Sequence, residues 1–334
     1  MQDTHISLAH GNGGRYMREL IEELFAARLS NSRLDPQADA VAVDLPDGVP
    51  VVTTDGFSVQ PLEFPGGNLG SLAVHGATND LAVAGAIPRY LTLSAFIEEG
   101  FEIATLERIV DGLAAAASEI SVEVVAGDTK VVPRGHGGGV YLACTAVGTR
   151  DPSLDLSMAR IQMGDVLLVS GSVGDHGTAV MLAREQFGLR GDLQSDSASV
   201  LAFTRALLDL PGLRFMRDPT RGGLATVGHE IVHATGMEVH MNERDIPVKD
   251  PVRAVCEMLG YDPYFLACEG RVVAVVASEH AEAALERWRA VPGGEQSAII
   301  GQVVSGRPRV VLHTDIGGER VLEELEDDPL PRIC

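Results

Sequence analysis

The sequence has few aromatic residues and no long apolar run, and each shortage excludes a class of protein. One Trp, five Tyr and nine Phe make up 4% of the chain, whereas the hydrophobic content is 45% with many Ala, Val and Leu. This balance is typical of packed helix and sheet layers rather than of disorder. No stretch approaches the roughly 18 apolar residues of a membrane-spanning helix, and no basic segment with an apolar core stands at the N-terminus. We therefore expect a cytoplasmic protein with no membrane partner.

Cysteine is also scarce, and its spacing is informative. Cys144, Cys256, Cys268 and Cys334 are far apart and form no Cys-x-x-Cys pair. This pattern speaks against a zinc knuckle and against a disulfide framework. We expect four reduced thiols.

Basic residues are outnumbered, with 26 Lys and Arg against 47 Asp and Glu and a net charge of −21. Such a chain repels the phosphate backbone of nucleic acids unless it has a local basic patch. We expect small molecules and proteins as partners, and no nucleic acid.

A length of 334 residues favours two domains, each large enough to bury its own core. The polar, Pro-containing stretch 148–164 separates two halves in which strands and helices mix without a strict βαβ alternation. The fold class that this indicates is α+β. We expect an N-terminal domain at 1–155, a C-terminal domain at 156–314 and a flexible tail at 315–334.

Apolar runs and periodicity predict the individual elements. Strands are expected at 49–54, 90–96, 122–126, 140–147, 166–169, 272–276, 297–304 and 309–313. Helices are expected at 69–84, 105–118, 178–187 and 198–208, with two more opening after the glycines at 11–14 and 222–223.

Carboxylates are placed where metal ligands are often found. Asp55 and Asp128 stand at the expected ends of two strands, and Asp80 follows Asn79 on a helix of small residues. Mg²⁺ prefers oxygen ligands and often shares them with substrate phosphates, so three convergent carboxylates predict a magnesium site. The alternative is that these Asp residues only form turns.

The glycine loop His10-Gly11-Asn12-Gly13-Gly14 leads into an amphipathic helical pattern. Free backbone N–H groups and a helix dipole suit an anion there. The loop lacks the Lys-Ser/Thr of a P-loop, so a flexible N-terminus is the alternative.

Four further charged residues fit phosphate and acid–base chemistry. Lys130, Arg217 and Arg221 are cations of the kind that face a phosphate, or else ordinary surface charges. Glu269 follows apolar residues, where burial can prepare a carboxylate to act as a base, or else it is a solvated turn residue.

The string His229-Glu230-Ile231-Val232-His233 matches the His-Glu-x-x-His signature of zinc proteases. The extended signature requires a third His at the position of Val239, and His240 comes one residue late. We therefore do not expect zinc hydrolysis, and these histidines are predicted on a helix surface or interface.

Glycines and acids dominate residues 315–328, which lead to Pro331-Arg332-Ile333-Cys334. Because the stretch has little apolar periodicity, we expect the tail to be mobile and to carry the Cys334 thiol to the site of chemistry.

Several motifs in one order resemble those of the HypE family of hydrogenase maturation factors. They are TTD at 53–55, FPGG at 64–67, NDLA at 79–82, IEEG at 97–100, GDTKVV at 127–132, RDPTRGG at 217–223 and PRIC at 331–334. The match spans essentially the whole chain. It departs from the family in Ala267-Cys268-Glu269-Gly270, where the family has Asn before Glu, and in the block around His229.

The resemblance implies a two-domain fold of the aminoimidazole ribonucleotide synthetase and selenophosphate synthetase superfamily. It implies a homodimer that associates through its N-terminal domains, and MgATP as the cofactor. The implied nucleotide-site residues are Gly11, Gly13, Gly14, Asp55, Asn79, Asp80, Asp128, Arg217, Asp218 and Arg221, with Asp55, Asp80 and Asp128 on the metal.

The implied activity is that of a carbamoyl dehydratase. Cys334 would receive a carbamoyl group from a partner carbamoyltransferase, and ATP-dependent dehydration would leave a thiocyanate, with Lys130 and Glu269 near the docked tail. An iron-carrying scaffold complex would then take the cyano group for [NiFe]-hydrogenase. Two alternatives are another ATP-dependent synthetase of the superfamily acting on a free small molecule, and a non-catalytic maturation scaffold.

Overall fold

The chain forms two compact units in the computed structural model, which describes residues 3–184, 191–327 and 333–334. The N-terminal unit comprises Met1–Leu81, Ala86–Asp151 and Cys334, and the C-terminal unit comprises Ala82–Gly85 and Pro152–Ile333. The division therefore falls at 151/152, compared with the 155/156 expected. The last two residues are assigned to different units.

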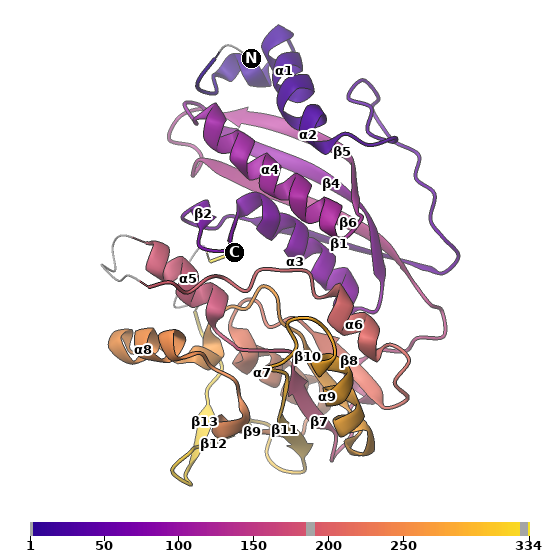
Figure 1. The fold of residues 1–334 in the computed structure, drawn as a ribbon, viewed down its shortest axis with the longest axis vertical. Helices are drawn as coiled ribbons and strands as arrows, with labels where there is room; N and C mark the ends of the chain where they lie inside the picture. Colours follow the sequence, from indigo (N-terminus) through magenta and orange to yellow (C-terminus); the bar gives the residue numbers. More distant parts are fainter. Residues whose placement is uncertain (1–2, 185–190, 328–332) are drawn as a thin grey trace. The chain divides into compact units, whose positions relative to one another are not determined.

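The N-terminal unit is built on a four-stranded sheet (Figure 1). Its strand order is β1 (Val49–Phe57), β6 (Val140–Arg150), β4 (Ile87–Glu98) and β5 (Glu123–Val132). Only β4 and β5 are parallel to each other among these pairs. Helices α3 (Leu69–Val83) and α4 (Ile103–Glu119) cover one face, and β2 (Glu63–Phe64) pairs with β3 (Gly67–Asn68) beside them.

Burial alternates along these strands as expected for a sheet with one covered face. In β4, Leu93 and Ala95 are buried against the helices, whereas Phe96 on the other face is 41% exposed. Val52 of β1 is 61% exposed on that same outer face. The N-terminal unit therefore presents an open sheet face that includes apolar side chains.

The N-terminal segment is helical on both sides of the glycine loop. Its parts are η1 (Leu8–Gly11), α1 (Arg15–Glu19), the π-helical η2 (Leu20–Ala26) and α2 (Ala27–Leu29). Leu20, Leu24 and Phe25 of η2 are buried, which confirms the apolar face expected after the glycines.

The C-terminal unit is built on a seven-stranded sheet in the order β13-β12-β9-β11-β7-β10-β8. The strands are β7 (Val166–Val169), β8 (Leu213–Arg217), β9 (Glu238–Asn242), β10 (Val273–Val276), β11 (Ala298–Val304), β12 (Val310–His313) and β13 (Glu319–Leu322). Neighbours are antiparallel except β9 and β12, which are parallel. Helices α5 (Asp175–Ala183) and α8 (Asp250–Leu259) lie outside this sheet.

Both faces of this sheet are buried. Leu167 and Val169 of β7 join the core beneath α7 (Gly223–Thr235), whereas Leu168 joins the opposite core beneath α6 (Leu201–Leu207) and α9 (Ala281–Arg289). Strands buried on both faces have continuous apolar sequences, which is why β7 was predicted with its observed bounds. None of the helices in the described part of the chain is both long and apolar enough to cross a membrane.

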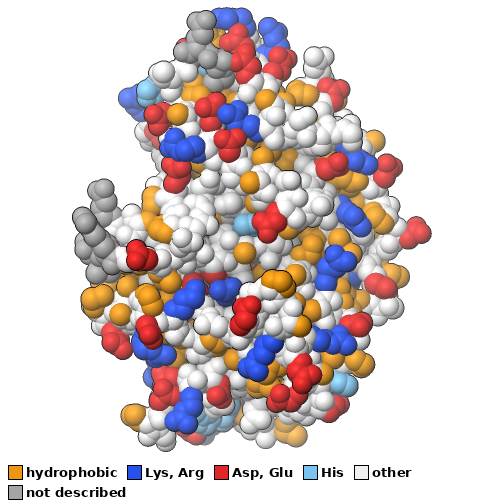
Figure 2. Space-filling view, viewed as in Figure 1, with side chains coloured by type: hydrophobic (Ala, Val, Ile, Leu, Met, Phe, Trp, Pro, Cys, Tyr) orange, Lys and Arg blue, Asp and Glu red, His pale blue; other side chains and the backbone are white. Residues whose placement is uncertain are grey.

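The α+β class is confirmed, and several local predictions are corrected. Strands β1 and β5 run past Asp55 and Asp128, so neither carboxylate stands at a strand end. Residues 319–322, expected in a flexible tail, form β13 paired with β12. Helix α5 begins at Asp175, and its expected end at 187 lies outside the described residues. On the face shown in Figure 2, Lys and Arg are interspersed with Asp and Glu.

Candidate functional site

The glycine loop lies against strand β5 of the N-terminal unit. A methyl group at Gly11 would lie 2.9 Å from the Cβ of Val131, so the loop approaches the strand closely there. Gly13 has a φ of +76°, and neither Gly13 nor Gly14 has an atom near its open side. Gly14 is the residue before helix α1. The loop is thus anchored at one end and has room for a ligand at the other.

Asp128 and Lys130 alternate with buried residues on β5 and point to the open face of the sheet. The Lys130 ammonium lies 2.8 Å from Asp128 Oδ2, and the Thr129 N–H donates to Asp128 Oδ1 at 2.9 Å. The hydrogen bond from Lys130 is the main reason that the pKa of Asp128 is lowered. Both side chains are more than half exposed, so water screens the pair.

Asp55 and Asp80 lie on the covered side of the same sheet. Asp55 pairs with Cys144 across β1 and β6. Burial chiefly raises the pKa of this thiol, and the charge of Asp55 adds to the effect. Asp80 Oδ2 accepts a hydrogen bond of 2.7 Å from Thr53 Oγ1, which joins α3 to β1. Asn79, one residue earlier, is 2% exposed.

The three carboxylates do not converge within one chain, so the magnesium site expected from sequence stays a prediction. Asp55 shares a face with Cys144 and Leu93, whereas Asp128 pairs with Ser94 one row away and faces the other side. They also stand on the two edge strands of the sheet, about 14 Å apart at the usual strand spacing. The two side chains point to opposite faces because side-chain direction follows the register of each strand.

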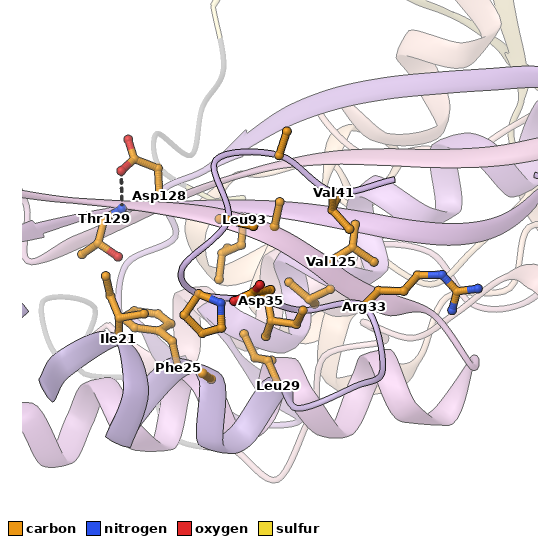
Figure 3. A pocket seen from close by; sticks show the side chains of 18 of the residues that line it. Ile21, Phe25, Leu29, Arg33, Asp35, Val41, Leu93, Val125, Asp128 and Thr129 are labelled. Carbon is orange, nitrogen blue, oxygen red and sulfur yellow. Dashed lines mark hydrogen bonds between the residues drawn. The ribbon is translucent and has the colours of Figure 1, made fainter. Parts of the chain in front are cut away.

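An apolar cavity of about 170 Å³ lies between the N-terminal helical segment and β5. Figure 3 shows Ile21, Phe25 and Leu29 on one wall and Val125 on the other. Arg33, Asp35 and Asp39 add charge from the segment that follows α2. Thr129 points toward this side of β5, and Asp128 points to the other side. A concave apolar site with a few polar groups is the usual form of a small-molecule pocket.

In the C-terminal unit, three loops that are distant in sequence are joined by backbone hydrogen bonds. They are the turn at 174–177, the turn at 217–223 and the loop at 266–270. The Gly177 N–H donates to the Ala267 carbonyl at 3.1 Å, and the Cys268 N–H donates to the Pro219 carbonyl at 3.0 Å. Gly223, with φ +59°, fits against the carbonyls of Tyr264 and Leu266, where a Cβ would come too close. The structure therefore unites the RDPTRGG motif with the loop that carries Glu269.

Glu269 is buried rather than solvated, with an exposure of 3%. Its N–H donates to Asp196 Oδ1 at 3.2 Å, and Asp196 in turn lies 3.5 Å from Arg271 Nε. Arg271 also bonds to the Ser172 carbonyl at 2.9 Å. The alternative of a solvated turn is therefore wrong, and a charged network fixes the backbone of this glutamate.

Cys268 stands where the resemblance predicts Asn, and its side chain faces the protein interior. The Gly174 N–H donates to Cys268 Sγ at 3.2 Å, and the thiol lies 3.7 Å from the Leu266 carbonyl. Burial raises the pKa of this thiol well above its ordinary value. Cys268 thus links two of the loops and stays protonated.

The charged residues of the RDPTRGG motif are not equivalent. Arg217 Nη2 forms an ion pair of 3.2 Å with Glu230 Oε1 on α7. Asp218 is 6% exposed, whereas Arg221 is exposed. Of the two arginines, Arg217 is engaged by an acid of α7, whereas Arg221 extends into solvent.

The penultimate residue is held in the C-terminal unit by a histidine that the sequence did not single out. His176 Nε2 lies 2.7 Å from the Ile333 carbonyl oxygen, and His176 Nδ1 lies 2.8 Å from Ser195 Oγ. Burial is the main cause of a lowered pKa for His176, so the ring is neutral. Because a carbonyl only accepts, Nε2 carries the proton and Nδ1 accepts from the Ser195 hydroxyl. The glycine turn around His176 was visible in the sequence, but nothing there indicated its partner.

Cys334 is held by its backbone in the N-terminal unit. Its carbonyl oxygen accepts from the Ser58 N–H at 3.1 Å and from Ser58 Oγ at 3.3 Å. The side chain is partly exposed, whereas the other three cysteines are buried. Of the four thiols, Cys334 alone is open to solvent. The expected mobility of Pro331 and Arg332 concerns residues outside the described part of the chain.

Comparison with known proteins places the two halves in one family. Residues 37–150 match the family model of the AIR synthase related protein N-terminal domain, and residues 162–313 match that of its C-terminal domain. The carbamoyl dehydratase HypE of Azotobacter vinelandii is 47% identical over 336 residues, which covers 100% of this chain and 98% of that protein.

Solved structures are similar over the same length. A crystal structure of the hydrogenase maturation protein HypE in complex with ATP has a TM-score of 0.93 and 41% identity, covering 98% of this chain and 99% of that one. The structure of a HypE–HypF complex matches with a TM-score of 0.80 and 39% identity, covering 93% of this chain and 99% of that one.

Proposed function

The chain belongs to the HypE family of carbamoyl dehydratases, and from this premise we propose that it converts a carbamoyl group on the sulfur of Cys334 into a thiocyanate with the use of ATP. The cyano group then passes to the iron of [NiFe]-hydrogenase through an iron-carrying scaffold complex. The proposal agrees with the full-length similarity to proteins named for this activity.

The accessibility of the thiols is the observation that carries the choice of Cys334. A thiolate is the reactive form of cysteine. Burial raises the pKa of Cys144 and of Cys256 to about 12, and it raises the pKa of Cys268 well above its ordinary value. These three thiols are protonated and enclosed at neutral pH. Cys334 is therefore the cysteine that a carbamoyl donor can reach.

The proposed reaction has two stages on the thiocarbamate. First, the γ-phosphoryl group of ATP is transferred to the carbamoyl oxygen, which gives ADP and turns that oxygen into a leaving group. The nitrogen then loses its two protons as the carbon–oxygen bond breaks and phosphate departs, which leaves a carbon–nitrogen triple bond on sulfur. The net change on Cys334 is the loss of one water, with ATP converted to ADP and phosphate.

We assign ATP to the N-terminal unit, by analogy with the relative that is described in complex with ATP. The open backbone of Gly13 and Gly14 suits phosphate, and Lys130 is an exposed cation on the adjacent strand. The apolar cavity beside β5 is suited to the adenine ring of ATP. The family resemblance further suggests four residues as nucleotide ligands. They are Asn79 and Asp80 of the N-terminal unit and Asp218 and Arg221 of the C-terminal unit.

Magnesium is the ion expected with ATP. However, Asp55, Asp80 and Asp128 lie on two faces of the sheet, so they do not form one site within a single chain. We therefore assign no step of the reaction to a metal held by these three residues.

We propose Glu269 as the base that removes protons from nitrogen. It is buried in the loop that contacts α5, and α5 carries the His176 that holds the Ile333 carbonyl. A carboxylate in such surroundings is suited to general base catalysis. Lys130 is proposed to stabilise charge on the transferred phosphoryl group.

We propose three partners: a HypF-type carbamoyltransferase, the scaffold complex and a second copy of this chain. The first is proposed because a relative forms a HypE–HypF complex. The open face of the N-terminal sheet, with Val52 and Phe96 exposed, is the surface that we propose for the homodimer. The proposed location is the cytoplasm.

A variant with Cys334→Ala tests the proposal. It should bind ATP as the wild type does and form no cyano product, because the side chain contributes little packing. Removal of 332–334 separates the alternatives: full ATP turnover on a free small molecule by the shortened chain would favour another synthetase of the superfamily. No ATP hydrolysis by carbamoylated full-length protein would favour a scaffold.

A further inference from the structure

Three potential metal ligands meet on the C-terminal unit. His229 and His233 lie one turn apart on α7, and Glu324 follows β13. One ligand atom from each of the three lies within 4.8 Å of the other two. We propose that these three side chains form a binding site for a divalent first-row transition metal, with Zn²⁺ as its probe. The proposal is independent of the dehydratase activity.

The distances between the ligand atoms are close to those expected around a bound metal ion. Zinc ligands lie about 2.0–2.1 Å from the metal, so neighbouring ligand atoms in a tetrahedral site are roughly 3.4 Å apart. His233 Nε2 and Glu324 Oε2 already lie 3.4 Å apart. Residues four apart on a helix project from the same face, and a ligand atom of His229 lies within 4.8 Å of both others.

His229 is held in the way that metal-binding histidines usually are. Its Nε2 lies 2.8 Å from the Leu322 carbonyl oxygen, to which it donates. The other nitrogen, Nδ1, therefore carries the lone pair in the neutral ring. Metal ligands of this type commonly donate their second N–H to a backbone carbonyl, which fixes the tautomer and the ring orientation. Here the same bond also joins α7 to the strand that precedes Glu324.

One of the three ligands is buried and two are exposed to solvent. His229 is 9% exposed, whereas the side chains of His233 and Glu324 are 61% and 60% exposed. The ion can thus enter from solvent and keep water on its open side. Nitrogen and carboxylate donors favour Zn²⁺ and its transition-metal neighbours over Mg²⁺, which prefers an all-oxygen shell.

The site is not that of a zinc protease. The general base of such an enzyme would be Glu230, and Glu230 is paired with Arg217 at 3.2 Å. A metal here would instead tie α7 to the segment after β13. We infer a structural or regulatory role, in which the ion stabilises the attachment of β13 and of the residues that lead from it.

Isothermal titration of the untagged, chelator-treated full chain with Zn²⁺ tests the site. We expect one Zn²⁺ per chain and a higher melting temperature with Zn²⁺ than without. Two variants, His233→Ala at an exposed position and His229→Asn, should each weaken Zn²⁺ binding by about tenfold or more. Loss of a residue that only supports a metal ligand already lowers the affinity by about tenfold or more. His136→Ala, an exposed histidine of the N-terminal unit, should bind as the wild type does.

Selectivity separates this site from general attraction to an acidic chain. With a net charge of −21, non-specific binding would accept Mg²⁺ as readily and would survive both histidine substitutions. Either result would overturn the proposal, as would a dissociation constant for Zn²⁺ weaker than about 1 mM.

Discussion

Burial separates the ionisable side chains that hold the site in place from those that are proposed to react. His176 is enclosed and neutral, and its single N–H is committed to the Ile333 carbonyl. Asp175, beside it in sequence, is also enclosed, and burial raises its pKa although Lys249 lies 2.6 Å away. These residues organise the site, and Glu269 and Cys334 are left for the proposed chemistry.

Glu269→Gln keeps the shape of the side chain and removes its basicity. We predict that Cys334 is still carbamoylated but that its ATP-dependent dehydration slows by about 10²–10⁴-fold, as expected when a general base is lost. The measurement is single-turnover conversion of pre-carbamoylated protein, followed by mass, with the exposed Glu279→Gln as the matched control. A rate within about twofold of wild type would mean that the base lies elsewhere.

His176→Leu removes the donor that holds the penultimate residue. Because loss of a buried hydrogen-bond partner costs about 1–3 kcal/mol, the dehydration step should slow by roughly tenfold while carbamoylation of Cys334 keeps its rate. A carboxypeptidase should also release Cys334 faster from this variant. Unchanged dehydration and unchanged release would show that the His176–Ile333 bond does not position the tail.

Among the elements, helices α3 and α4 pack so closely that one contact admits no side chain. A Cβ at Gly70 of α3 would overlap with the carbonyl oxygen of Ile109 on α4. The small residues expected on this helix allow such close packing, and the structure identifies α4 as the partner helix.

Gly70→Ala should therefore destabilise the N-terminal unit by about 1–3 kcal/mol, the usual cost of overpacking, despite the better helix propensity of Ala. Gly56→Ala is the matched control, because nothing lies within 4 Å of the Cβ that it adds. Chemical denaturation of both variants provides the measurement. Equal stability of the two would contradict the packing described for α3 and α4.

The elements also show what sequence reasoning could and could not reach. Strands buried on both faces, such as β7 and β10, were predicted from their apolar runs. Strand β13 was missed because Glu319–Leu322 has only two apolar residues and is held by pairing with β12. The Asp55-Gly56 pair suggested a turn, yet pairing with β6 continues to Phe57. Cross-strand partners, which decide such cases, are not visible in a single segment.

The same limit applies to the candidate site. The ordered motifs predicted that the RDPTRGG turn and Glu269 belong to the functional region, and the backbone bonds of the C-terminal unit bring them together. Asp55 and Asp128 do not meet within one chain because side-chain direction depends on register, which the sequence does not display. The role of His176 needed the tertiary contact with Ile333.

At the scale of the whole molecule, buried histidines make stability depend on pH. Burial lowers the pKa of His75 on α3 to about 4, compared with an ordinary value of 6.5. The unfolded chain therefore takes up a proton below pH 6.5 that the folded chain refuses until about pH 4. Stability is greatest above pH 6.5 and falls as the pH drops through this window. The lowered pKa of His176 acts in the same direction.

His75→Gln removes one of these titrations. Between pH 7 and pH 5, the loss of unfolding free energy should be smaller in the variant by about 2 kcal/mol. Denaturation curves of both proteins at the two pH values give the comparison. An identical pH dependence would show that His75 is not titrated as its burial implies.

The central claim is that Cys334 carries the group on which the chain acts. Intact-mass measurement of the protein after incubation with the carbamoyl donor system tests it most directly, with and without ATP and with Cys334→Ala alongside. We predict a gain of one carbamoyl group on Cys334 without ATP, loss of one water from that adduct when ATP is added, and neither change in the variant. A carbamoyl group on another residue, or an adduct on Cys334 that ATP leaves unaltered, would contradict the account.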